Sequence, residues 1–194
     1  MKPANTIKIF LDAHIFDGEF QGSRTFIKEL YNMLLQKKDL ELYIAAYDIE
    51  NLQQYFPKAD NVVFIKLKNR SSILRLLVEI PQLIKKHGIG YAHFQYMVPP
   101  VKNCRFIVTT HDVIFNEFPQ EFSLWYRVSK NFLYSRAAKK ADILTTDSEY
   151  SKRSIHRYLG VPSEKVNVIR LGINSGFFNS YNKEAEKEYR SEKL

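Results

Sequence analysis

The stretch VTTHDVIF, residues 108–115, begins as a β-rich run and then presents a histidine followed by an aspartate. Together with the preceding Phe106 and Ile107, its first residues form an apolar, β-branched segment that is typical of a buried strand. Two ionisable residues directly after such a strand indicate that it ends at a surface. In an open α/β sheet, ligands bind at the carboxyl ends of the strands. The stretch therefore predicts a functional edge at His111 and Asp112.

Outward from this stretch, runs with strand periodicity alternate with runs of helical periodicity along most of the chain. The expected strands are Thr6–Asp12, Glu41–Tyr47, Val62–Lys66, Tyr91–Phe94, Arg105–Thr110, Asp142–Thr146 and Val166–Leu171. The expected helices are Ser23–Lys37, Ile49–Phe56, Ser71–Lys86, Ser123–Lys140 and Glu149–Leu159. This alternation favours an α/β fold: a doubly wound, mostly parallel Rossmann-like sheet of about seven strands with helices on both faces. We expect the first five strands in the order 3-2-1-4-5.

Local signals refine this outline. Ser23 is a candidate N-cap for the first long helix, Pro81 should kink or restart the second, and Gly160 should end the last. The segment between Phe94 and Arg105 contains Pro99-Pro100, which predicts a functional loop or a crossover without a helix. Residues 1–178 are expected to form the Rossmann-like domain, and the charged residues 179–194 a linker or the start of a second domain.

Composition narrows the class of protein. The 194 residues suit one domain, and 45% hydrophobic residues suit a folded core rather than disorder. The single cysteine, Cys104, excludes an internal disulfide and suits a reducing compartment. No signal peptide and no spanning segment of about eighteen apolar residues is found. We therefore expect a cytoplasmic protein, with a peripheral place at the inner membrane face left open.

The formal net charge of +8 leaves several partners open: nucleic acid, an anionic lipid surface, a phosphorylated small molecule, or none of these. No RNA- or DNA-binding motif occurs and the basic residues are spread over several elements, so no nucleic-acid partner is expected. The basic and aromatic helix Ser123–Lys140 fits a membrane interface, but an ordinary helix with a core stripe and a solvated face is the preferred interpretation.

Polar residues follow three of the strands that should be neighbours. These polar residues are His14 after the first strand, His93 and Tyr96 at the fourth strand, and His111 and Asp112 at the fifth strand. On this basis His14, His93 and His111 could converge on one crevice, and Tyr96 and Asp112 are further candidates for contact with a substrate. Three histidines also allow a zinc site, but short ligand spacing is absent and consecutive strand residues diverge. No metal is therefore expected.

The loop EFQGSRTF, Glu19–Phe26, joins the first strand to a helix. Gly22 would let backbone amides approach a phosphate at the helix start, Ser23 sits beside it, and Arg24 adds a positive charge. The pattern is neither a dinucleotide fingerprint nor a P-loop, and a plain glycine turn explains it as well.

Several motifs together resemble the N-terminal domain of family 4 glycosyltransferases with the GT-B architecture. They are GSRTFIKELYNML, QYMVPP after His93, VTTHDVIF, RAAKKADILTTDSEYSKRSI and YLGVPSEKVNVIRLGIN, and they cover roughly residues 6–178. The resemblance implies one half of a two-domain enzyme, in which this acceptor-side half faces a C-terminal domain that binds the nucleotide-sugar donor. On that expectation the chain alone is inactive.

The resemblance also implies roles for residues. His111 would be the catalytic residue that lies beside the transferred sugar, and Gly22 and Ser23 would lie near the donor diphosphate and the acceptor. Ser148 and Glu149 match a motif near the inner cleft, although Ser148 could simply cap a helix. No cofactor or metal is implied, since the nucleotide-sugar is a substrate.

The function implied is retaining transfer of a sugar from a nucleotide-sugar to a glycan or glycolipid acceptor, in cell-surface polysaccharide synthesis. The alternative is a stand-alone sugar- or nucleotide-binding module without catalysis. A nucleotide-sugar epimerase is disfavoured by the absence of a dinucleotide fingerprint.

Overall fold

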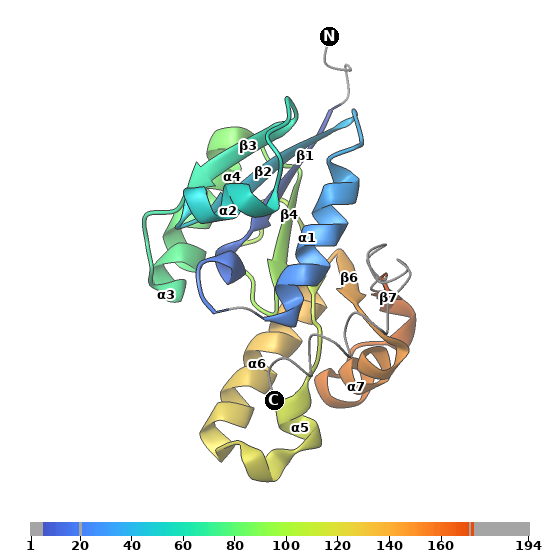
Figure 1. Ribbon diagram of the computed structural model, residues 1–194. Helices are drawn as coiled ribbons and strands as arrows, with labels where there is room; N and C mark the ends of the chain where they lie inside the picture. Colours follow the sequence, from blue (N-terminus) through green and yellow to red (C-terminus); the bar gives the residue numbers. More distant parts are fainter. Residues whose placement is uncertain (1–5, 20, 171, 173–194) are drawn as a thin grey trace, which may run out of the picture.

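The computed structural model describes residues 6–19, 21–170 and 172, and its centre is a parallel sheet (Figure 1). The strands are β1 (Ile7–Asp12), β2 (Leu40–Ala46), β3 (Val62–Lys66), β4 (Tyr91–Gln95), β5 (Arg105–Thr109), β6 (Ile143–Thr146) and β7 (Val166–Val168). They lie in the order β3-β2-β1-β4-β5-β6-β7, and all six neighbouring pairs are parallel. The predicted α/β class and the order of the first five strands are confirmed.

Helices cover both faces of the sheet. The longer ones are α1 (Gly22–Leu34), α2 (Ile49–Tyr55), α4 (Ile80–His87), α6 (Leu124–Lys140) and α7 (Glu149–Leu159). The short ones are η1 (His14–Phe16), α3 (Ser72–Leu74), η2 (Arg75–Glu79), α5 (Ile114–Glu117), η3 (Pro119–Glu121) and η4 (Ser163–Lys165).

Alternate side chains of each strand supply two separate cores. In β1, Phe10 packs in the core that contains residues of α4, α6 and α7. Its neighbours Ile9 and Leu11 pack in the other core, which contains residues of α1 and α2. Since both faces are covered, the central strands are apolar on both sides, and their polar side chains gather at the strand ends.

Side-chain caps start two of the helices, and the predicted glycine ends a third. Asp48 accepts a hydrogen bond from the Asn51 amide at the start of α2, and Ser123 accepts one from Tyr126 at the start of α6. Gly160 ends α7 with a left-handed backbone at φ 65°. The prediction that Ser23 caps α1 is wrong. The helix begins one residue earlier, at Gly22, and Gln21 is its N-cap without a side-chain bond.

The predicted helix over Ser71–Lys86 is divided as Pro81 requires. The segment Arg75–Glu79 is a π-helix, and α4 starts anew with Pro81 in its first turn. Proline has no amide hydrogen and its ring meets the carbonyl four residues earlier, so the wider π turn accommodates it. The predicted restart is confirmed.

Other expectations have mixed outcomes. β4 and β5 pair directly without an intervening helix, which confirms the crossover predicted for the proline-containing segment. The last strand is shorter than predicted and ends at Val168, while α5 was not predicted. The charged tail 179–194 and the domain boundary at residue 178 lie outside the described residues.

Two glycines allow a matched test of backbone conformation. An added Cβ meets no atom within 4 Å at Gly22 or at Gly160, but only Gly160 has a left-handed φ. Gly160→Ala should therefore lower the free energy of unfolding by about 1–2 kcal/mol. Gly22→Ala, in an ordinary helical conformation, should leave it equal or raise it by up to about 1 kcal/mol. Urea denaturation of both variants measures this difference, and equal losses would contradict it.

Candidate functional site

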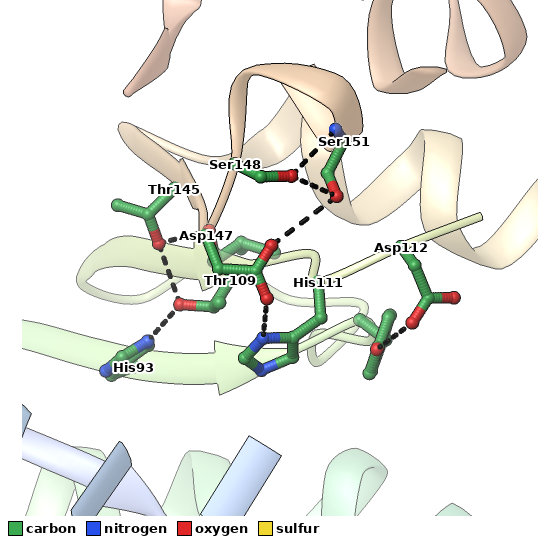
Figure 2. A network of polar contacts seen from close by, with 10 residues as sticks. His93, Thr109, His111, Asp112, Thr145, Asp147, Ser148 and Ser151 are labelled. Atoms are coloured by element: carbon green, nitrogen blue, oxygen red, sulfur yellow. Dashed lines mark hydrogen bonds and ion pairs between the residues drawn. The ribbon is translucent and has the colours of Figure 1, made fainter. Parts of the chain in front are cut away.

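A chain of hydrogen bonds joins β4, β5 and β6 beneath the carboxyl edge of the sheet (Figure 2). The Tyr31 hydroxyl lies 3.0 Å from His93 Nδ1, His93 Nε2 lies 2.7 Å from Thr109 Oγ1, and that hydroxyl lies 2.7 Å from Thr145 Oγ1. Thr145 donates its proton to the Val108 carbonyl. Thr109 must then donate to Thr145 and accept from His93 Nε2, so Nδ1 accepts from Tyr31.

His93 is therefore a neutral core histidine. It is 2% exposed and both of its ring nitrogens are used. Burial, together with the charge of nearby His111, lowers the pKa of His93 to about 3. The structure places this predicted substrate-binding residue beneath the edge rather than at it, where it ties α1 to the sheet.

His111 lies at the edge itself, two residues after the end of β5. Its Nδ1 is 3.3 Å from Asp147 Oδ2, and its ring packs edge-on against Phe26 with centroids 5.2 Å apart. Burial lowers the pKa of His111, while the hydrogen bond and charge of Asp147 oppose that shift. In the neutral ring, Nδ1–H donates to Asp147, and Nε2 keeps a lone pair that can accept a hydrogen bond.

Asp147 connects this imidazole to the start of α7. The Ser151 hydroxyl lies 3.4 Å from Asp147 Oδ1, and the Ser151 amide donates to Ser148 Oγ at 3.0 Å (Figure 2). Ser148 thus caps α7, which is the alternative role considered for it, and Glu149 is exposed in the first turn. Asp147 was not predicted, although it follows β6 directly.

Tyr96 has a strained backbone at the same edge. Its φ of 60° is the single positive value at a non-glycine residue among the described residues. Its hydroxyl lies 3.4 Å from Asp112 Oδ2, and its ring stacks on Tyr134 and tilts towards His111. Burial and the charge of Asp112 raise the pKa of Tyr96. Such strain, of about 1–3 kcal/mol, clusters at functional sites. The structure brings Tyr96, His111 and Asp112 together at this edge.

Buried polar atoms without hydrogen-bond partners gather at the ends of these strands. They are both amide atoms of Gln95 at the end of β4, Thr110 Oγ1 and His111 Nε2 after β5, and Thr146 Oγ1 at the end of β6. A buried polar group without a partner costs about 1–3 kcal/mol. Several such groups in neighbouring strands indicate a place where a ligand supplies the partners.

The glycine loop approaches this edge from α1. Phe26, one turn after Gly22, contacts the His111 ring, so the start of α1 and the imidazole lie on the same side of the sheet. Arg24 is directed inwards: its Nε donates to the Ile15 carbonyl at 2.5 Å and its Nη2 donates to the Gly18 carbonyl. It is 5% exposed, so its charge fixes the loop before α1.

His14 lies away from the other histidines. Its Nδ1 is 3.2 Å from Asp12 Oδ1, and it lines a separate pocket beyond β1, β2 and β3. Although burial opposes ionisation, the charges of His14 and Arg75 hold the pKa of Asp12 below its ordinary value. The predicted convergence of three histidines on one crevice is not found. Within residues 6–19, 21–170 and 172, no group of three or more His, Cys, Asp or Glu side chains could hold a metal ion.

Comparisons with known proteins identify the family and the fold. A family profile described as Glycosyltransferase Family 4 matches residues 20–177. No curated protein sequence matches the chain. Among solved structures, a glycosyltransferase from Rickettsia africae ESF-5 is 14% identical with a TM-score of 0.59, covering 97% of this chain and 49% of that one.

Two further structures have the same fold. Anabaena HepE, solved with UDP and glucose, is 13% identical with a TM-score of 0.62, over 96% of this chain and 50% of that one. A UDP-N-acetylglucosamine 2-epimerase described as putative, from Listeria monocytogenes, is 12% identical with a TM-score of 0.58, over 84% and 44%. The fold alone thus does not separate transferases from epimerases.

The chain is similar over nearly its whole length to about half of the Rickettsia and Anabaena structures. Its parallel α/β sheet is therefore one half of a GT-B fold. The profile match covers most of the sequence, and the chain belongs to glycosyltransferase family 4. It spans about half the length of the structures that it matches.

The buried His93 generates a prediction about acid stability. Its pKa is depressed in the folded protein, so its contribution to stability is present above the unfolded value of about 6.5 and is lost as pH falls towards 3. His93→Gln keeps a side chain that can bond Tyr31 and Thr109 but cannot titrate. It should flatten the dependence of unfolding free energy on pH by up to about 1.4 kcal/mol per pH unit.

Urea denaturation between pH 6.5 and pH 5.5 measures this slope, because the carboxylates with lowered pKa, Asp12, Glu79 and Asp142, titrate below that window in both the folded and the unfolded chain. The exposed His156→Gln is the matched control and should keep the original slope. An unchanged slope in His93→Gln would contradict the assignment.

Proposed function

We propose that this chain is the acceptor-side, N-terminal half of a retaining glycosyltransferase. The complete enzyme moves a sugar from a nucleotide-sugar donor, held mainly by a C-terminal domain, to a glycan or lipid-linked acceptor. The observation that carries the proposal is the His111–Asp147 pair at the carboxyl edge of the sheet, beside the start of α1, in a chain of family 4. HepE, which has the same fold, was solved with UDP and glucose.

The chemistry needs few groups from this half. The bond between the anomeric carbon and the donor phosphate oxygen breaks as the bond to the acceptor oxygen forms, and positive charge develops on the sugar. The acceptor hydroxyl gives up its proton to the leaving diphosphate. The diphosphate leaves with negative charge, which amide groups at a helix start can stabilise. Gly22 and Ser23 at the start of α1 are the candidates for this role, and no metal is required of them.

His111 would orient the transferred sugar. With Nδ1–H held by Asp147, the lone pair on Nε2 accepts a hydrogen bond from a sugar hydroxyl and so pairs a buried polar atom that otherwise has no partner. Gln95 and Thr110 have unpaired polar atoms at the same edge and could bind further hydroxyl groups. Tyr96 and Asp112, joined by their side chains, would form the neighbouring wall.

The proposal includes a place at the cytoplasmic membrane face in cell-surface polysaccharide synthesis, which rests on the family resemblance. In support, the first half of α6 exposes Leu124, Trp125 and Phe132 by 71%, 81% and 68% beside Lys130. Figure 1 places this end of α6 beyond the sheet, near α5. None of the described helices is both long and apolar enough to span a bilayer. Sedimentation with anionic vesicles at low and high salt tests peripheral binding.

Removal of the imidazole should impair transfer. In the complete enzyme, His111→Ala should lower the rate of sugar transfer at least about 100-fold, because the sugar loses an oriented partner. The relative change in its free energy of unfolding should be far smaller than the relative change in the transfer rate. A panel of nucleotide-sugars with product analysis measures the rate and the retention of configuration.

His87→Gln is the control. His87 lies at the end of α4, where its carbonyl accepts a hydrogen bond from Lys8 in β1, away from the carboxyl edge. This variant should keep full activity. Full activity of His111→Ala would reject the catalytic role. Binding of a nucleotide-sugar by a complete protein that transfers and hydrolyses nothing would favour the alternative of a binding module.

Close approach of a diphosphate to α1 can be tested at Gly22. An alanine there meets nothing within 4 Å in the protein itself, so the fold should tolerate it. If donor phosphate approaches the backbone at this point, Gly22→Ala should still lower transfer about tenfold or more, because a methyl group would displace a ligand held by backbone amides. Unchanged transfer would assign Gly22 to a plain turn.

A further inference from the structure

A second polar pocket opens beyond the carboxyl ends of β1, β2 and β3, apart from the His111 edge. Its volume is about 800 Å³. Its basic lining residues are Lys66 at the end of β3, Arg70 in the following loop and Arg75 from η2, and its acidic ones are Asp17, Asp48 and Glu50. None of Tyr96, His111 and Asp112 lines it.

Two of the acidic side chains already accept hydrogen bonds from backbone amides. Asp17 accepts hydrogen bonds from the amides of Tyr47 and Asp48, at 2.9 Å and 2.7 Å. Asp48 accepts from Asn51 as the cap of α2. These carboxylates serve to shape the loops around the pocket, and so they compete little for the basic groups.

The basic side chains are less satisfied. Arg75 is 7% exposed, its Nε lies 3.4 Å from Asp12 Oδ2, and that nitrogen forms no hydrogen bond. Arg70 lies over the Tyr47 ring at 4.3 Å. In the described part of the chain, neither Arg70 nor Lys66 forms an ion pair. Arg75 is thus a buried arginine whose Nε has an ion-pair partner but no hydrogen bond, and Lys66 and Arg70 beside it have no ion pair within the described residues. Such a group of cations fits an anion that makes charge-assisted hydrogen bonds.

The loop that carries Arg70 is held in place before any ligand binds. Glu79 is buried in η2 and accepts hydrogen bonds from the amides of Lys68 and Asn69, at 2.6 Å and 3.0 Å, and from the Asn69 side chain. Although burial opposes ionisation, these bonds keep the pKa of Glu79 below its ordinary value. The π-helix before Pro81 carries both Arg75 and Glu79, so one irregular element fixes the charge and the loop.

We propose that this pocket binds a phosphate ester of the acceptor, through Lys66, Arg70 and Arg75. The inference rests on the proposed transferase function, because it assigns the pocket to the acceptor in the acceptor-side half. The source can be a soluble sugar phosphate or a lipid-linked phosphate. The second is favoured because η2, which supplies Arg75, exposes Leu77 and Val78, and the preceding α3 exposes Ile73 and Leu74, all by 45–64%.

The test is direct binding to the 194-residue chain by titration calorimetry. The soluble probe is a hexose 1-phosphate, with the uncharged hexose as its reference. The lipid probe is phosphatidylcholine vesicles with or without phosphatidic acid. The double variant Lys66→Gln/Arg70→Gln should weaken binding of the phosphate-bearing probe at least about tenfold. The control is Lys139→Gln/Lys165→Gln, which removes the same charge from a different hollow near α6 and η4.

Binding of hexose phosphate that depends on Lys66 and Arg70 identifies a soluble acceptor. Dependence seen only with phosphatidic acid vesicles identifies a lipid-linked one. No phosphate-dependent binding, or equal weakening in the control, overturns the inference. Arg75 is tested as Asp12→Asn/Arg75→Gln, so that no buried carboxylate is left without its cation, and this variant should also lose binding.

His111→Ala separates this inference from the proposed function. It should abolish transfer by the complete enzyme and leave phosphate binding unchanged. If the pocket binds no phosphate but transfer depends on His111, only the proposed phosphate site is rejected. If the pocket binds phosphate but the complete enzyme transfers sugar without His111, the catalytic role of His111 is rejected instead.

Discussion

The common direction of the strands is the constraint on which the rest of this protein depends. Six parallel pairings bring the ends of all seven strands to one edge, although the residues at those ends are far apart in the sequence. Parallel strands require crossovers, and the helices in those crossovers bury both faces of the sheet. Polar side chains are then accommodated chiefly at the edge, where the strands leave the core.

The buried chain of hydrogen bonds through His93, Thr109 and Thr145 makes that edge rigid. Each hydroxyl in it has one donor and one acceptor role, which permits a single proton arrangement with His93 neutral. Tyr31 extends the chain to α1, the helix whose start lies near His111. The positions of the imidazole and of the glycine loop are consequently coupled through the core and not only through the surface.

The edge divides into two zones of different chemistry. Around His111 the groups are neutral or acidic, several buried polar atoms have no partner, and the Tyr96 backbone is strained, all of which suits hydroxyl-bearing ligands. Beyond β1 to β3, basic side chains line a pocket whose loops are held by Asp17 and Glu79. Transfer of a sugar to an anionic acceptor would use both zones, one for the sugar and one for the acceptor charge.

Periodicity, prolines and caps in the sequence were enough to predict the α/β class, the order of the first five strands, the restart at Pro81 and the end of α7 at Gly160, because these depend on local propensity and on alternation of elements. The strand-end rule likewise identified Tyr96, His111 and Asp112 as residues at the ends of neighbouring strands. The sequence did not predict the direction in which these side chains point. Only tertiary packing decided that His93 points into the core and that Arg24 turns inwards to carbonyl groups. It also decided that Asp147 binds His111. Finally, it decided that Asp12 is shared by His14 and Arg75, which line another pocket. Each of these depends on which neighbour satisfies a buried charge or hydrogen bond, and that neighbour lies far away in the sequence.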